Sequence, residues 1–176
     1  MRTFRKDLIV NNRYGKRFKV CKGGVLHESA DPGATAERLQ TYFSNVPKIG
    51  ANFHAAVDWI EDIQLLPWDE KGGHAKEPAN TMYFGLEMCR PYDGDPEKKE
   101  KMIITYNASV SAFARLYHYV YKIDKVTKEN TRSHHEVALK WHNTTHVDPT
   151  SYLKEIGKDM DMFRAEVQRE LNLLRR

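Results

Sequence analysis

The segment 82–89, which reads MYFGLEMC, constrains the fold of this chain more than any other. It is apolar along almost its whole length, with Glu87 as its single charged residue. Alternate side chains of a strand point to opposite sides of a sheet, so a strand that is apolar at consecutive positions is covered on both faces. We therefore expect this segment to form a strand in the middle of a sheet.

The remaining hydrophobic pattern places strands in the first half of the chain and helices in the second. We expect strands at 20–28, 53–57 and 62–66, with one helix between them at 34–44. Apolar residues at helical spacing mark 103–120, 133–141 and 161–174. Strands followed by helices within one domain predict an α/β fold, in which helices flank a central mixed β-sheet.

The length of 176 residues suits a single domain that buries its core without disulfide bonds. No apolar run approaches the ~20 residues of a transmembrane helix, and residues 1–7 lead into no apolar core of a signal peptide. The two cysteines, Cys21 and Cys89, form no C-x-x-C pair, which argues against a zinc finger or a thioredoxin motif. These observations exclude a transmembrane protein and a disulfide-rich miniprotein.

The chain is mildly basic, with 28 Lys and Arg residues against 24 Asp and Glu residues, a net charge of +4. The two signs of charge are interspersed, which is typical of an ordinary solvated surface. A basic surface also suits nucleic acid or an anionic cell wall. The sequence has no basic helix or stacking-aromatic motif, so we expect neither a nucleic-acid partner nor a membrane partner.

The segment 133–148 is rich in residues that bind metals, with four histidines and one aspartate in sixteen residues. Neutral imidazole and carboxylate groups are zinc ligands, and a catalytic zinc ion needs three of them and one open position. His27 ends an apolar strand, where a polar side chain can point into a cleft. The alternative interpretation of the segment is a solvated loop with incidental metal affinity. The absence of an H-E-x-x-H motif excludes the helix-borne arrangement of metalloproteases.

Glu87 is unusual because its neighbours in the predicted central strand are apolar. Burying a carboxylate costs several kcal/mol unless it is paired or functional. Burial would raise its pKa, which is what a general base near pH 7 requires. The alternative is a side chain that points outward at the strand end and bonds to Arg90 or a loop.

Several motifs occur in a fixed order along the chain: VLHESADPGATA (25–36), FHAAVD (53–58), GHA (73–75), GLEMC (85–89), SH (133–134) and HVDP (146–149). In this order they resemble the motifs of zinc N-acetylmuramoyl-L-alanine amidases. These are the catalytic domains of many phage and bacterial wall lysins, and they are related to peptidoglycan recognition proteins. The resemblance runs from about residue 18 to 165. It implies a central mixed sheet flanked by helices, with a zinc site in a cleft at one edge of the sheet.

The resemblance also implies roles for individual residues. The zinc ligands fall on His27, His134 and Asp148, and the catalytic acid falls on Glu87. His146 takes the place of a residue that is often lysine, and would donate a hydrogen bond to the developing oxyanion.

Other residues are assigned with alternatives that stay open. His135 or His142 could replace His134 as the second ligand, because the separation from His134 to Asp148 is longer than in some branches of the family. His54 and His74 are expected to line the cleft, where they could orient the ligands or bind substrate. Trp68 could stack on a sugar or serve only in packing.

The activity implied is zinc-dependent hydrolysis of the amide bond between the lactyl group of N-acetylmuramic acid and L-alanine in peptidoglycan, as in an endolysin or autolysin. The alternatives are a non-catalytic peptidoglycan-binding module of the same fold and a zinc hydrolase that acts on another amide. We expect residues 1–176 to form one catalytic domain without a wall-binding module. We further expect a monomer, made in the host cytoplasm without a signal peptide, that acts on the cell wall.

Overall fold

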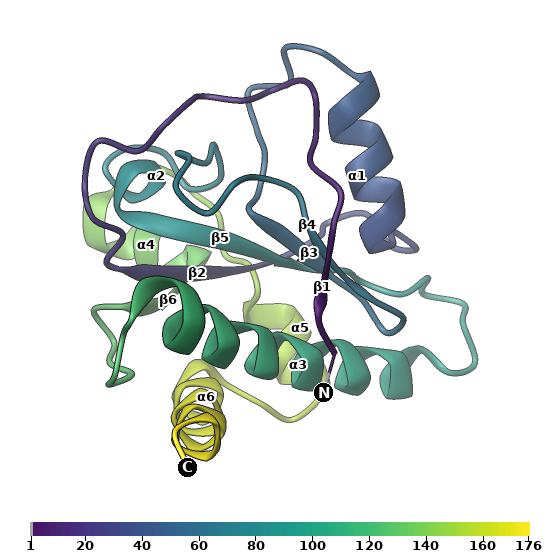
Figure 1. Cartoon of the computed structure of the whole chain (residues 1–176). Helices are drawn as coiled ribbons and strands as arrows, with labels where there is room; N and C mark the ends of the chain where they lie inside the picture. Colours follow the sequence, from purple (N-terminus) through teal and green to yellow (C-terminus); the bar gives the residue numbers. More distant parts are fainter. Residues whose placement is uncertain (1) are drawn as a thin grey trace.

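The computed structural model describes residues 2–176, so Met1 of the predicted domain lies outside the described residues. A six-stranded sheet in the order β1-β4-β3-β5-β2-β6 forms the centre of the molecule (Figure 1). Its strands are β1 (Phe4–Lys6), β2 (Gly23–Glu28), β3 (Ala55–Val57), β4 (Asp62–Gln64), β5 (Tyr83–Met88) and β6 (Thr131–Ser133). Strands β3 and β4 pair antiparallel, and the other neighbours pair parallel. The mixed sheet and the central place of β5 are as predicted.

The helices follow the expected order, with two short additions. They are α1 (Ala36–Asn45), α2 (Ala79–Met82), α3 (Lys98–Arg115), α4 (His134–Trp141), α5 (Thr150–Glu155) and α6 (Met160–Leu174). A π-helical turn, η1 (Leu116–Tyr121), continues α3. Each predicted helix is present, while α2 and α5 are too short to leave a periodic pattern in the sequence. Within the described part of the chain, none of these helices combines the length and apolar character needed to cross a membrane.

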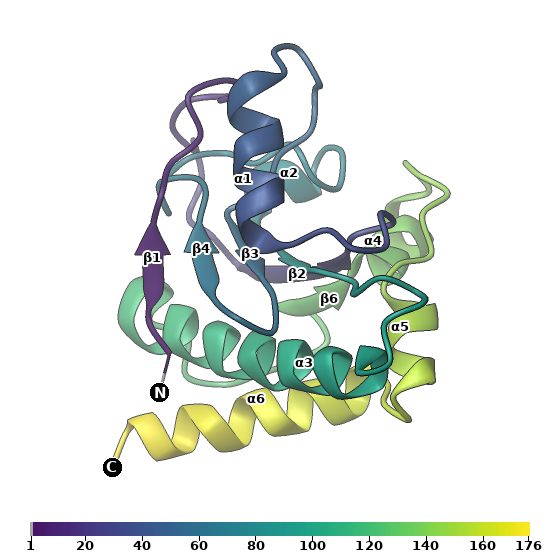
Figure 2. The ribbon, with the colours of Figure 1, turned by 90° about the vertical axis from the view of Figure 1, so that its right-hand side faces the viewer.

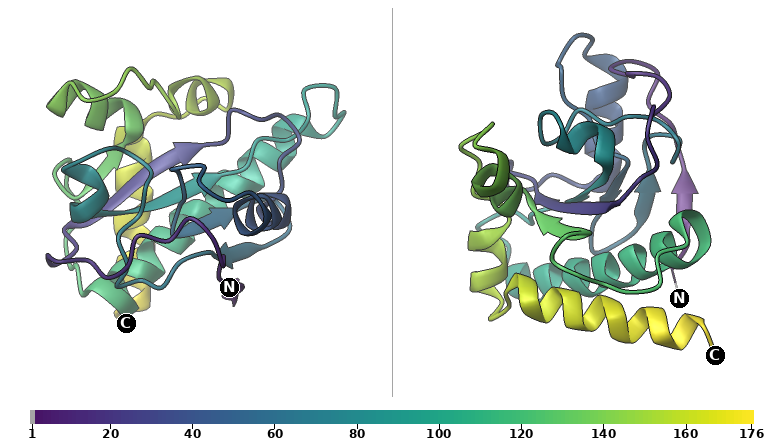
Figure 3. Two further views of the ribbon diagram at one scale, coloured as in Figure 1. Left: turned by 90° about the horizontal axis from the view of Figure 1, so that it is seen from above. Right: turned by 90° about the vertical axis from the view of Figure 1, so that its left-hand side faces the viewer.

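Helix α3 lies against one face of the sheet, and α6 packs beneath α3 and reaches the edge strand β6 (Figures 2 and 3). Leu26, Phe84 and Leu86 point to this face and are fully buried against Phe113 of α3, in the cluster that α6 completes. Burying each such side chain contributes about 1.5–3 kcal/mol. The large core on this side therefore holds β2 and β5 in a fixed position.

The opposite face is only partly covered. Helix α1 contacts β3 and β4, where its Phe43 packs into a second cluster with Ala56 and Ile63. The carboxyl ends of β2 and β5 extend beyond this cover, and their penultimate residues, His27 and Glu87, are paired in register. Side chains alternate along a strand, so these two point away from the α3 core and towards the open part of this face.

Candidate functional site

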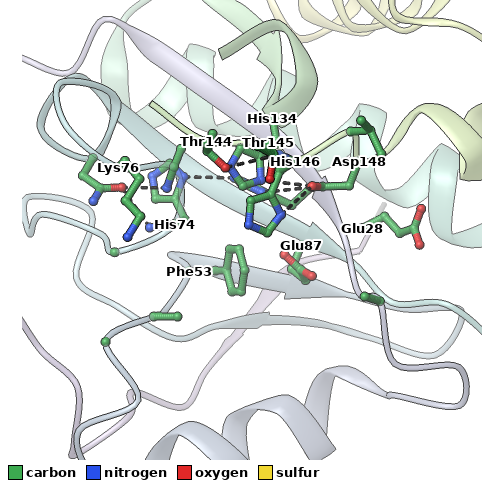
Figure 4. A pocket seen from close by; sticks show the side chains of 18 of the residues that line it. Glu28, Phe53, His74, Lys76, Glu87, His134, Thr144, Thr145, His146 and Asp148 are labelled. Atoms are coloured by element: carbon green, nitrogen blue, oxygen red, sulfur yellow. Dashed lines mark hydrogen bonds and ion pairs between the residues drawn. The ribbon is translucent and has the colours of Figure 1, made fainter. Parts of the chain in front are cut away.

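A cleft of about 760 Å³ opens at the edge of the sheet where β2 and β5 end. Its walls come from these two strands, from the first turn of α4 and from loops around residues 49–53, 73–80 and 144–148. Figure 4 shows His134, His146 and Asp148 gathered together, with Glu87 beside them. Elements distant in the sequence therefore converge on one polar site, at the edge of the sheet where the sequence placed it.

Three potential ligands meet at the centre of the cleft. One ligand atom from each of His27, His134 and Asp148 can be chosen so that all lie within 4.8 Å of one another. The Nδ1 atom of His27 lies 3.3 Å from Oδ2 of Asp148, and Nδ1 of His134 lies 3.0 Å from Oδ1 of the same carboxylate. Two imidazoles and one carboxylate in this arrangement can hold a divalent metal ion.

The folding of each segment explains why these side chains meet. Ser133 ends β6 and caps α4, since its hydroxyl accepts a hydrogen bond from the backbone N–H of Glu136. The Glu136 carboxylate accepts in turn from the backbone N–H of Ser133. This capping box fixes the start of the helix and hence the direction of His134, its first residue.

The hydrogen bonds behind His27 define which of its nitrogens carries the proton. The backbone carbonyl of Tyr83 can only accept, so the Nε2–H of His74 donates to it at 3.3 Å. The Nδ1 of His74 is then an acceptor, and the Nε2–H of His27 donates to it at 3.0 Å. The Nδ1 of His27 is left with a lone pair that faces Asp148.

This lone pair tests whether a metal ion fits the site. Burial lowers the pKa of His27 to about 4, so its imidazole is neutral at pH 7. A neutral acceptor nitrogen and a carboxylate oxygen repel each other at close range unless a cation lies between them. Among residues 2–176, the Nε2 of His134 is buried without a hydrogen-bond partner. The donor set therefore fits a divalent cation.

The imidazole ring of His74 fits into a space that two glycines leave open. A Cβ atom added to Gly72 or to Gly85 would lie 2.6 Å from the imidazole, so both positions must be glycine for the ring to fit. The side-chain oxygen of Asn80 accepts hydrogen bonds from the backbone N–H groups of His74 and Ala75. The ring is thus held against His27 from several directions.

Glu87 brings a carboxyl group to the same cleft. Its side chain is 5% exposed, and Oε2 has no hydrogen-bond partner among the described residues. Burial raises its pKa well above the usual value, and the nearby charges of Asp148 and Glu28 raise it further. Arg90, the alternative partner considered from the sequence, binds Glu28 at 3.0 Å instead. The carboxyl of Glu87 therefore holds a proton more tightly than an exposed glutamate does, which suits a group that takes up a proton in a reaction.

Known proteins share parts of this sequence and fold, although no protein-family model matches the chain. It is 33% identical over 116 residues to the N-acetylmuramoyl-L-alanine amidase BlyA of Bacillus subtilis strain 168, an alignment that covers 53% of this chain and 31% of BlyA. It is 30% identical over 107 residues to the N-acetylmuramoyl-L-alanine amidase CwlL of Bacillus licheniformis, covering 51% of this chain and 30% of CwlL. The alignments thus span about a third of the length of these curated relatives.

Solved structures match over nearly the whole chain. The hydrolase AmiA of Staphylococcus aureus, in complex with its ligand, superposes with a TM-score of 0.83 at 19% identity, covering 98% of this chain and 85% of AmiA. The catalytic domain of XlyA superposes with a TM-score of 0.71 at 23% identity, covering 94% of this chain and 99% of that domain. The chain is similar to the N-acetylmuramoyl-L-alanine amidases. The resemblance read from its motifs is confirmed, and so is the fold class.

His146 lies at the mouth of the amidase-like cleft. Its side chain is 64% exposed, and its ring stacks on that of His134 at a centroid distance of 4.3 Å. Its Nδ1 lies 3.5 Å from Oδ1 of Asp148. The structure therefore places His146 beside the three potential ligands and leaves it accessible to a bound molecule.

The two alternative ligands from the histidine-rich segment lie elsewhere. The Nδ1 of His135 is 3.2 Å from the hydroxyl of Thr150, and His142 is exposed at the left-handed end of α4. Neither belongs to the group formed by His27, His134 and Asp148. The structure thus brings His134, rather than its two neighbours, into the amidase-like site.

The three residues assigned to substrate binding occupy different places. His74 lines the cleft, although its ring is nearly buried behind His27. His54 is fully buried, where its Nδ1 accepts from the backbone N–H of Gly85 at 3.0 Å and its Nε2 lies 3.0 Å from the carbonyl of Glu70. Trp68 packs edge-on against Phe4 at 5.1 Å. Neither His54 nor Trp68 is among the residues that line this cleft.

Some cleft residues had no role in the sequence analysis. They include Lys76 and the neighbouring threonines Thr144 and Thr145, which lie in loops (Figure 4). Loops leave no periodic pattern, so only the nearness of Lys76 to the GHA motif could have pointed to it.

Proposed function

We propose that the chain is a zinc-dependent N-acetylmuramoyl-L-alanine amidase that hydrolyses the amide bond between the lactyl group of N-acetylmuramic acid and L-alanine in peptidoglycan. The observation that carries this proposal is the meeting of the His27–His134–Asp148 cluster and the unpartnered carboxyl of Glu87 in one cleft. Similarity to proteins named as amidases supports it.

His27, His134 and Asp148 would hold the zinc ion, since two imidazoles and a carboxylate are a usual donor set for catalytic zinc. When bound, zinc is a Lewis acid that makes water more acidic and a carbonyl carbon more electrophilic. His74 keeps the ring of His27 in the required tautomer and orientation, because metal-binding histidines depend on the hydrogen bond made by their other nitrogen.

Glu87 moves the proton in this reaction. It accepts a proton from the water that attacks the amide carbonyl, and the oxygen of that water forms the new C–O bond. As the C–N bond breaks, Glu87 returns the proton to the leaving nitrogen of L-alanine. A raised pKa suits both steps, since the group must gain and lose a proton near neutral pH.

His146 stabilises the negative charge that develops on the carbonyl oxygen. Its accessible ring can donate one N–H to that oxygen when neutral, and carries a positive charge as well when protonated. The stack against His134 keeps the ring close to the reacting group.

The test is the release of new N-terminal L-alanine from purified cell walls, measured together with the zinc content of the protein. We expect Glu87→Gln to lower the rate by about 10²–10⁴-fold while zinc binding is retained, because the general acid–base group is lost. Glu61→Gln provides a matched control, since Glu61 lies in an ion pair with Arg5 outside the cleft. Unchanged rates in the Glu87 variant would refute the assignment.

The same experiment separates the alternatives. A wild-type protein that binds zinc and cell walls but releases no amine is a non-catalytic peptidoglycan-binding module. Release of amines other than N-terminal L-alanine identifies a zinc hydrolase of a different amide. Either result overturns the amidase proposal.

The proposal places the activity at the bacterial cell wall, with peptidoglycan as the macromolecular partner, as in an endolysin or autolysin. A monomer is sufficient for it, because His27, His134, Asp148 and Glu87 all come from one chain.

A further inference from the structure

Lys76 lines the cleft, and its backbone has a strained conformation. Its φ angle is +59°, in the left-handed region that residues other than glycine seldom adopt. Such a conformation persists only where the surrounding structure enforces it, and it is concentrated at sites of function. The position therefore raises the question of what a lysine contributes there that glycine would not.

The residues on both sides of Lys76 are firmly held. The side-chain oxygen of Asn80 accepts from the backbone N–H groups of His74 and Ala75. The side-chain nitrogen of Asn143 donates to the carbonyl of Ala75 at 3.4 Å and to that of Glu77 at 2.8 Å. The backbone at Lys76 is thus fixed from two directions, so its side chain projects from a defined point on the cleft wall.

The charge of Lys76 is not neutralised by its own chain. The adjacent carboxylate, Glu77, accepts instead from Lys71 at 2.8 Å and from the hydroxyl of Thr81 at 2.8 Å. Within residues 2–176, Lys76 forms no ion pair or side-chain hydrogen bond. An ammonium group without a partner beside a binding cleft remains available to a ligand.

Lys76 also makes the two ends of the cleft differ in charge. Of the described residues that line it, Lys76 is the one lysine or arginine, and the carboxyl groups are those of Glu28, Glu87 and Asp148. Figure 4 shows Lys76 and Glu28 on opposite sides of the histidine cluster. The charge of Glu28 is offset by Arg90, at 3.0 Å. One end of the cleft therefore favours a negatively charged group on a bound molecule.

We propose that Lys76 binds a free carboxylate on the peptide part of the substrate and makes the site selective for peptides that carry one next to the L-alanine. This inference rests on the proposed function, because it takes the cleaved peptide as the ligand. An ammonium–carboxylate contact gives the pair a charge-assisted hydrogen bond, which is stronger than a neutral one.

The test uses two N-acetylmuramoyl-L-alanyl peptides that differ at one group, a free carboxylate or a carboxamide on the residue after L-alanine. Their dissociation constants are measured by calorimetry on the Glu87→Gln protein, in which turnover is slowed. We expect Lys76→Gly to weaken binding of the carboxylate peptide by about 10- to 100-fold, the effect of one charge-assisted hydrogen bond, and to leave the carboxamide peptide within about 2-fold. Lys76→Arg should retain the preference.

Lys122→Gly is the matched control. Lys122 also has a left-handed backbone, with φ +54°, but it follows η1 and does not line the cleft. Glycine relieves the backbone strain at either position, so we expect the melting temperature of both variants to equal or exceed that of the parent. Only the Lys76 variant should lose its preference for the carboxylate peptide.

The outcomes separate the two proposals. The role of Lys76 is overturned if the parent protein binds the two peptides equally, or if Lys76→Gly weakens binding of both peptides by the same factor. The proposed function still holds after either result, provided that the wild-type protein cleaves both peptides. If the wild-type protein cleaves neither, the proposed function fails, while a carboxylate preference that depends on Lys76 still supports the binding site.

Discussion

The Nε2 atom of His27 lies 3.0 Å from Nδ1 of His74, and the Nε2 of His74 lies 3.3 Å from the carbonyl of Tyr83. This chain of hydrogen bonds connects a backbone carbonyl of β5 to Nε2 of His27, and it leaves Nδ1 of the same ring facing Asp148. It makes His74 a positioning residue, which acts on the site through His27.

Removing this positioning contact should weaken metal binding. We expect His74→Ala to lower zinc affinity by about 10- to 100-fold, the usual effect of losing the hydrogen-bond partner of a metal-binding histidine. Calorimetric titration of the metal-free protein with zinc measures the change. His74→Gln can still accept from His27 through its side-chain oxygen, so it should recover part of the affinity. Equal affinity in wild type and His74→Ala would show that the contact has no positioning role.

The sequence predicted the parts of the fold that have a local pattern. The apolar run at 82–89 predicted β5 at the centre of the sheet, and helical spacing predicted α3, α4 and α6. Strands β1 (FRK) and β6 (TRS) were not predicted, because neither lies in an apolar run like those that contain the equally short β3 and β4. Strand β1 joins the sheet through its parallel pairing with β4, about sixty residues away in sequence, which no local pattern reveals.

The candidate site, like the fold, could be predicted from the sequence only in part. The motif resemblance gave the residues that the structure brings together at the centre, because those residues carry the shared chemistry. The contact between His27 and His74 spans 47 positions and depends on glycines at 72 and 85 that make room for a ring. Trp68 was considered for its chemical type alone, and its ring instead meets Phe4 of an edge strand that the sequence did not predict.

The buried carboxyl of Glu87 should make the stability of the metal-free protein depend on pH. Its pKa is raised in the folded state, so its contribution is fully present below the pKa of the unfolded chain and is lost as the pH rises through the folded value. We expect Glu87→Gln to match wild type in denaturant unfolding near pH 4 and to become the more stable of the two at pH 8. A stability difference that does not change with pH would contradict a raised pKa.

His54 should have the opposite dependence. Burial, with a smaller contribution from the charge of Arg17, lowers the pKa of His54 to about 3 in the folded protein. The unfolded chain therefore takes up a proton first, and stability falls as the pH drops from about 6.5 towards 3. The loss from this group is about 5 kcal/mol at most.

Substitution of His54 tests this dependence. We expect His54→Gln, which keeps polar atoms near Gly85 and Glu70, to flatten the fall in unfolding free energy between pH 6 and pH 4. Replacement of the half-exposed His118, on η1, is the control for the loss of a histidine away from His54. Parallel pH profiles for wild type and His54→Gln would contradict the lowered pKa.

A buried ion pair joins the end of α3 to the sheet. The Nη2 of Arg115 lies 2.5 Å from Oδ2 of Asp62, and both side chains are less than a tenth exposed. Burial raises the pKa of Asp62 in spite of this arginine, which shows that desolvation of the carboxylate outweighs the attraction. The pair therefore stabilises the fold only as long as both partners are present.

Substitutions at Arg115 and Asp62 test whether losing one partner destabilises the fold more than losing both. We expect Arg115→Met to lower the free energy of unfolding by about 3–5 kcal/mol, because it leaves the buried carboxyl of Asp62 with the longer contact to the partly exposed Arg2, at 3.6 Å. The double variant Arg115→Met with Asp62→Leu should recover most of this loss, since no buried charge remains. Arg5→Met breaks an exposed pair with Glu61 on the same edge of the sheet and should cost less than about 1 kcal/mol. Denaturant unfolding measures all three, and a double variant as unstable as Arg115→Met alone would show that the stability comes from packing of the arginine rather than from its charge.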